Sequence, residues 1–186
     1  MITAMRTPSV ADLHKQLQEN AASARALWQA HSAVALTRPP APARWSAAEC
    51  LAHLNLTNRA YVPRIAAALS DLGSRHLRGS GPFRMSGNAR LLVYWLEPPS
   101  RLRLPSTKPF LPEHNLDVAS VAAEFHSLVE QIATQLRSAD GLALDQIQIH
   151  SPFAEKMQYN LYSALVIIPA HNRRHLWQAD RALHGV

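Results

Sequence analysis

The sequence MQYNLYSALVIIPAHNRRHLWQADRAL, at residues 157–183, decides the fold more clearly than any other stretch of the chain. Residues suited to a buried face recur in it every three or four positions, which is the spacing of one side of an α-helix. Gly185 follows as a stop signal. The pattern predicts a helix from about Met157 to Leu183, whose buried face consists of Leu161, Ala164, Ile168, His171, His175, Gln178 and Ala182.

Three other segments have the same helical periodicity. Before the first of them, Thr7 and Pro8 suit an N-cap and a first helical position. At the start of the second, Ser46 and Glu49 have the spacing of a capping box, in which each side chain satisfies a free backbone amide. Four such helices predict an all-α four-helix bundle, with the first three helices at about 10–31, 45–69 and 117–138.

A long segment rich in Pro, Gly and Arg separates the second helix from the third. A structureless loop of that length is uncommon in a compact domain, so ordered pieces are expected within it. We predict a short helix over Arg90–Leu96 and an extended stretch over Arg101–Pro112. The length also permits a crossover that lets helices two and three run parallel. We expect one domain over residues 1–186.

The bulk composition excludes several classes of protein. Of the 186 residues, 47% are hydrophobic and 17% are charged, which is typical of a globular domain. The net charge of +6 is spread over scattered arginines with no recognisable nucleic-acid motif, so no nucleic-acid partner is expected.

The chain also lacks the marks of a membrane or secreted protein. The longest apolar stretch, Ala164–Ala170, is too short to cross a bilayer, and Met1–Pro8 has no apolar core of a signal peptide. The single Cys50 fits a reducing compartment. We therefore expect a cytoplasmic protein with no membrane partner.

Two histidines interrupt the buried face of the last predicted helix. His171 and His175 occupy adjacent turns of that face. A buried polar group without a partner costs about 1–3 kcal/mol, and one metal ion would satisfy both rings. The alternative is that both rings bond to other side chains or carbonyls, or face solvent. Residue 172 is Asn rather than Glu, which excludes a zincin protease site.

His53 supplies a third candidate ligand. It lies two turns into the second predicted helix, with Thr57 and Arg64 on the same flank. A bundle can bring this flank toward the fourth helix, which would give a three-histidine site with open positions, as in catalytic metal centres. Taken alone, His53 would more often be a histidine with ordinary hydrogen bonds.

Two motifs resemble a known family. WSAAECLAHL, at residues 45–54, closely resembles the second-helix signature of the DinB/YfiT-like metalloenzymes, and HNRRHLWQ, at residues 171–178, resembles their last-helix motif. The resemblance extends over about residues 10–183. It implies a four-helix bundle, often a homodimer, in which His53, His171 and His175 hold zinc or nickel. It also implies a small-molecule substrate, since characterised relatives activate a low-molecular-weight thiol for transfer or isomerisation.

Two functions follow as hypotheses. The first is a metal-dependent transferase, isomerase or hydrolase, with the metal as a Lewis acid and Arg64 as a substrate-binding residue. The second is a non-catalytic small-molecule or protein-interaction bundle, with a structural metal or none. A structural site would be closed by a fourth protein ligand, and the sequence offers no obvious one, which favours the enzyme. No catalytic base can be assigned: Glu49 is explained by its cap, and Cys50 is expected to be packed.

Overall fold

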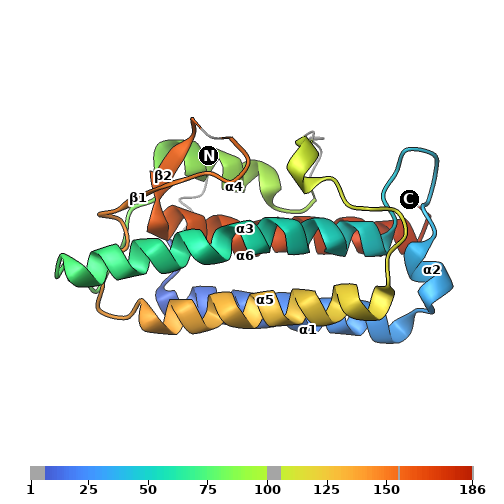
Figure 1. Cartoon of the computed structure of the whole chain (residues 1–186), viewed down its shortest axis with the longest axis horizontal. Coiled ribbons are helices and arrows are strands. Elements are labelled where there is room, and N and C mark those ends of the chain that lie inside the picture. The colour runs from blue at the N-terminus through green and yellow to red at the C-terminus, as the bar shows by residue number, and fades with distance from the viewer. Residues whose placement is uncertain (1–6, 100–105, 155, 186) are drawn as a thin grey trace.

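The computed structural model describes residues 7–99, 106–154 and 156–185. Four long helices dominate it: α1 (Val10–Ala30), α3 (Ala47–Ser74), α5 (Val118–Ser138) and α6 (Leu161–Leu183). Both α1 and α3 pack against α5 and α6. In Figure 1, α3 and α5 run parallel to each other and antiparallel to α1 and α6. The predicted all-α four-helix bundle, with a crossover between its second and third long helices, is confirmed.

Shorter elements surround the bundle. Helix α2 (Ala33–Thr37) follows α1, α4 (Gly87–Leu96) packs on α6, and a 3₁₀ turn, η1 (Lys108–Phe110), packs on α3. The short helix predicted in the crossover is therefore confirmed, and it begins three residues earlier than expected. Of the extended stretch predicted at 101–112, residues 101–105 lie outside the described residues, and the 3₁₀ turn occupies part of the remainder.

Two predicted helix starts are wrong. Helix α6 begins at Leu161 rather than Met157, because residues 158–160 form strand β2 (Gln158–Asn160), which pairs antiparallel with β1 (Gln148–His150). The Asn160 side chain then caps the helix by accepting from the Ser163 amide.

Helix α1 also starts later than Thr7 suggested. Ser9 is its N-cap and forms a capping box with Asp12. The capping box predicted for Ser46 and Glu49 at the start of α3 is present.

Helix α6 is the central element of the core. Every residue from Leu161 to Asn172 is buried, because α1, α3 and α4 all pack against this helix. This enclosure means that a polar side chain in α6 must find a partner inside the protein. None of the described helices combines the length and the apolar character that crossing a bilayer would require.

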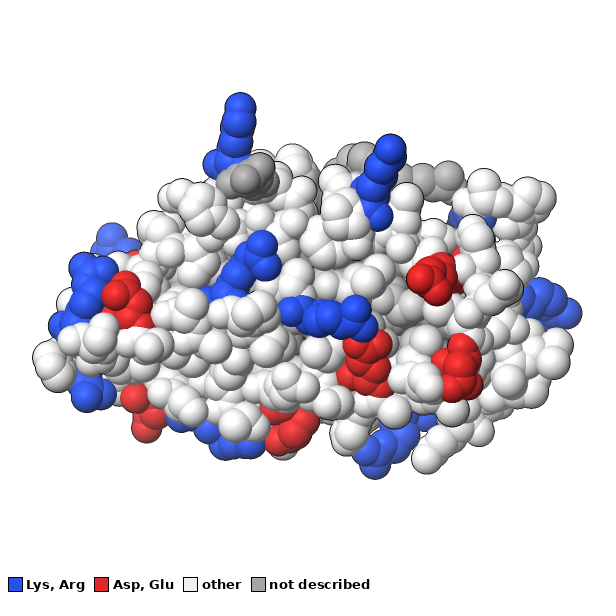
Figure 2. Space-filling model, in the orientation of Figure 1, with Lys and Arg blue, Asp and Glu red and all other residues white. Residues whose placement is uncertain are grey.

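The charged side chains on the face shown in Figure 2 are dispersed. Lysines and arginines stand singly or beside carboxylates, and they do not gather into one large basic patch on this face. Arg59 on α3 forms an ion pair with Glu124 on α5. The expectation that the chain has no nucleic-acid partner stays a prediction.

Candidate metal centre

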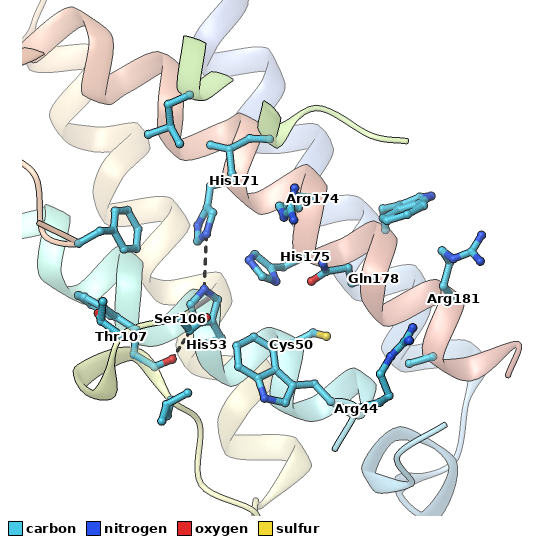
Figure 3. A pocket seen from close by; sticks show the side chains of 18 of the residues that line it. Arg44, Cys50, His53, Ser106, Thr107, His171, Arg174, His175, Gln178 and Arg181 are labelled. Atoms are coloured by element: carbon cyan, nitrogen blue, oxygen red, sulfur yellow. Dashed lines mark hydrogen bonds between the residues drawn. The ribbon is translucent and has the colours of Figure 1, made fainter. Parts of the chain in front are cut away.

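Three histidines from two helices converge inside the bundle. His53 comes from the second turn of α3, and His171 and His175 come from adjacent turns of α6 (Figure 3). Their exposed fractions are only 3%, 7% and 7%. Each ring offers one nitrogen such that these atoms all lie within 4.8 Å of one another, so the group could hold a metal ion. The ring centroids of His53 and His175 are 4.4 Å apart, and those of His171 and His175 are 4.6 Å apart.

A backbone carbonyl orients the His53 ring. Its Nδ1 lies 2.7 Å from the carbonyl oxygen of Phe110, in η1. Because a carbonyl can only accept, Nδ1 carries the proton, and the lone pair of the neutral ring is on Nε2. That Nε2 faces Nε2 of His171 at 3.4 Å. A hydrogen bond from the outer nitrogen to a carbonyl is the usual way in which proteins orient a metal-binding histidine.

The His175 ring is incompletely satisfied. Its Nδ1 is buried and has no hydrogen-bond partner among the residues that the structure describes. Leaving such an atom unpaired costs about 1–3 kcal/mol. Imidazole nitrogen is a preferred ligand of zinc and nickel, and three such rings are a common donor set. The orphaned nitrogen and the converging rings therefore fit a metal ion.

The electrostatics of the site keep the three rings neutral. Burial lowers the pKa of His53, and the hydrogen bond to the Phe110 carbonyl opposes this shift without reversing it. Burial lowers the pKa of His171 and of His175 well below the ordinary value, and the charges of the neighbouring histidines and of Arg174 lower both further. A side-chain hydrogen bond with Gln178 raises the pKa of His175 and so opposes these shifts. Metal binding requires neutral imidazole, so the site holds its candidate ligands in the competent state at neutral pH.

A pocket of about 720 Å³ opens beside the histidines, and all three of them line it. Aromatic side chains flank the rings. The Trp45 ring lies 5.0 Å from the His53 ring and 6.0 Å from the His175 ring, and the Phe153 ring lies 5.4 Å from the His171 ring. The histidines are thus buried within apolar walls and can still be reached by a small molecule.

The structure separates Arg64 from the histidines. Arg64 is eleven residues beyond His53 on α3, which keeps it on the same side of the helix but about 16 Å further along the axis. Its guanidinium donates to the Ala60 carbonyl at 2.6 Å, and it is not among the described residues that line the pocket. The role of Arg64 in substrate binding stays a prediction.

Glu49 and Cys50, the two other polar candidates near His53, lie in surroundings that favour a structural role. The Glu49 carboxylate accepts from the Ser46 amide at 2.7 Å and lies 2.7 Å from His114 Nδ1. Cys50 is only 2% exposed although it lines the pocket, and burial raises the pKa of its thiol to about 12. A thiol with so high a pKa stays protonated and is a poor nucleophile.

Several pocket residues escaped the sequence analysis. On α6, Arg181 lies three residues beyond Gln178, which the predicted buried face already included, and this periodicity was a usable signal. Arg44 lies in the Pro-rich connector before α3, where no periodicity indicates its direction. The Phe110 contact involves a backbone carbonyl, which no residue type can reveal.

Fold and site together define a class: an all-α bundle with three buried histidines that could hold a metal ion beside an open pocket. The chain matches the family model described as DinB superfamily over residues 16–179, and it belongs to that family. The match includes both motifs that carried the resemblance. A comparison with curated proteins found no significant match, and neither did a comparison with solved structures.

Proposed function

We propose that this protein is a metal-dependent enzyme that holds one zinc or nickel ion through His53, His171 and His175. The observation that carries the proposal is the convergence of three neutral, buried imidazoles on one wall of an open pocket. Convergent polar groups in an apolar pocket are the usual setting of a ligand or substrate site. Membership of the DinB superfamily supports it further.

The proposed reaction is the transfer or isomerisation of a small molecule with the help of a low-molecular-weight thiol. A metal ion at this position would supply Lewis acidity, which lowers the pKa of a thiol or water ligand toward neutrality. The chain's own residues would orient the metal ligands and exclude water from the site. The Phe110 carbonyl fixes the His53 ring, and the flanking Trp45 and Phe153 rings keep the site apolar.

The composition of the histidine group favours an enzyme over a structural metal site. A structural zinc is normally closed by four protein ligands, whereas a catalytic zinc has three and one exchangeable position. Within the described ranges, no Cys, Asp or Glu joins the three histidines in the group. The homodimer implied by the resemblance and the cytoplasmic location are further proposals, and light scattering of the purified protein tests the first.

Cobalt substitution tests whether the site is open. Untagged protein is stripped with a chelator, loaded with Co²⁺, and titrated with 2-mercaptoethanol while its visible spectrum is recorded. We expect the thiol to shift the absorption bands, because a thiolate ligand changes the geometry and charge-transfer bands of the metal. His53→Ala removes one proposed ligand and should abolish the response, whereas Tyr61→Phe, at a residue outside the pocket, should preserve it.

The opposite result is equally clear. If the cobalt spectrum indicates four protein ligands and ignores the thiol, and chelation greatly lowers the melting temperature, the metal is structural. The protein would then be a non-catalytic binding or interaction bundle.

A further inference from the structure

The pocket beside the histidines has an apolar end. There the rings of Phe110 and Phe153 lie 5.1 Å apart, and Phe153 lies 5.4 Å from the His171 ring. Leu92 from α4 and Met157 also line the pocket. Such a surface favours a hydrocarbon or aromatic group over a strongly hydrated one, because each apolar contact removes surface from water.

The other end of the pocket is basic. Arg181 is six residues beyond His175 on α6, which is about 9 Å along the helix axis. Its guanidinium lies over the Trp177 ring, 5.1 Å from the ring centroid, a contact that helps to fix its position. Arg44 comes from the connector before α3. Figure 3 shows Arg44 and Arg181 beyond His175, on the side away from His171.

The charge at this end is not balanced within the pocket. Arg44 and Arg181 line this end of the pocket, and the described lining contains no Asp or Glu. Neither Arg44 nor Arg181 forms an ion pair with any other residue that the structure describes. Like charges on a concave, apolar wall focus the field inside it and attract an ion of opposite sign. The guanidinium fork suits a carboxylate or a phosphate.

We propose that this pocket binds an amphiphilic organic anion. Its oxyanion lies between Arg44 and Arg181, and its apolar body extends past His175 toward Phe110 and Phe153. The proposal deepens the proposed function, on which it rests only for the position of the reacting centre, which would be a part of the ligand between its anionic group and its apolar end. Binding itself depends on the arginines and the apolar wall.

Calorimetric titration with simple probes tests the proposal. Octanoate, octyl phosphate, the neutral octanamide and the short propionate are each titrated into the protein as purified and after treatment with a chelator. The Arg44→Gln, Arg181→Gln double variant is compared with a matched control, Arg75→Gln with Arg78→Gln. The control removes the same charge at the far end of α3, from exposed residues outside the described pocket lining.

We expect the pocket double variant to bind octanoate or octyl phosphate at least about tenfold more weakly, because two charge-assisted contacts are lost. The control should bind like the wild type, and octanamide and propionate should bind much more weakly than octanoate. Tighter binding of octyl phosphate would identify a phosphate head group, and tighter binding of octanoate a carboxylate. Because the arginine effect is expected with and without metal, it is separable from a failure to find metal.

Four results would overturn the proposal. The first is an absence of binding by either anion, and the second is equal affinity for octanoate and octanamide. The third is an unchanged affinity in the pocket double variant. Propionate binding as tightly as octanoate would remove the apolar body from the assignment and reject the amphiphile.

Discussion

Two groups of buried polar side chains lie along α3, and they meet their hydrogen-bonding needs in different ways. Tyr61 and Tyr159, from α3 and β2, bond to each other through their hydroxyls at 2.5 Å, and neither lines the pocket. Eight residues earlier on α3, His53 meets His171 and His175 beside the pocket, and the Nδ1 of His175 has no described partner. The two tyrosine hydroxyls satisfy each other's hydrogen-bonding needs within the fold, whereas the histidine group needs a ligand from outside the chain.

The difference bears on what each group contributes. A satisfied buried pair adds modestly to stability and helps to specify one packing arrangement. An unsatisfied group lowers the stability of the free protein, and proteins commonly retain such strain where a ligand is bound. Four predictions compare the two groups directly.

The largest expected effect is on metal affinity. Untagged protein should bind about one zinc or nickel ion per chain, as the three-histidine group among the described residues predicts. His171→Ala should weaken binding by about 100-fold or more, since even partners of a ligand contribute 10–100-fold. Tyr61→Phe is the matched control from the satisfied pair and should leave affinity unchanged. Equal metal content in both variants, measured by elemental analysis, would contradict the three-histidine site.

The next effect is on acid stability in the metal-free protein. Burial lowers the pKa of all three histidines, so their rings stay neutral in the folded state while the unfolded chain takes up protons below about pH 6.5. The unfolded state then binds more protons, and stability falls as pH drops below about 6.5, by up to about 1.4 kcal/mol per pH unit for each ring.

The tyrosine pair should not contribute to this acid sensitivity. Burial raises the pKa of Tyr61 and of Tyr159, so both are uncharged in the folded and unfolded states throughout the acid range. Urea denaturation between pH 7 and pH 5 should therefore give the same slope for Tyr61→Phe as for the wild type. His175→Leu should give a shallower slope. A slope unaffected by His175→Leu would mean that this ring is protonated in the fold.

The smallest effects are on the stability of the metal-free protein at neutral pH, and they should have opposite signs. Tyr61→Phe removes a satisfied hydrogen bond and should destabilise by about 0.5–1.5 kcal/mol. His175→Leu removes a buried nitrogen without a described partner and should stabilise by about 1 kcal/mol. Urea midpoints at pH 7.5 measure both. If the two substitutions destabilise equally, the histidine group is as well satisfied as the tyrosine pair.

Helical periodicity made the bundle predictable, and the limits of the prediction have physical causes. The apolar faces of all four long helices have the 3.6-residue repeat, and only their ends were misplaced. Strands β1 and β2 span three residues each, too few for a two-residue alternation to stand out, so the start of α6 was set too early.

Site residues that are close in the sequence were easier to predict than those that only the fold brings together. His171 and His175 are one turn apart on one helix, so their proximity follows from spacing alone. His53 was a candidate because a bundle can bring its flank of the second helix toward the last helix, and the family resemblance supported this choice. No sequence spacing could establish the contact, because it joins two separate helices. Arg64 was singled out because it shares a helical side with His53, without allowance for the distance along the axis.

X-ray absorption at the zinc edge would show the three-histidine centre itself, because it records the ligands of the ion in the untagged protein. We expect three imidazoles, seen as nitrogen at about 2.0–2.1 Å, with one further light atom from solvent. A sulfur shell at about 2.3 Å, or fewer than three imidazoles, would contradict a three-histidine centre open to the pocket.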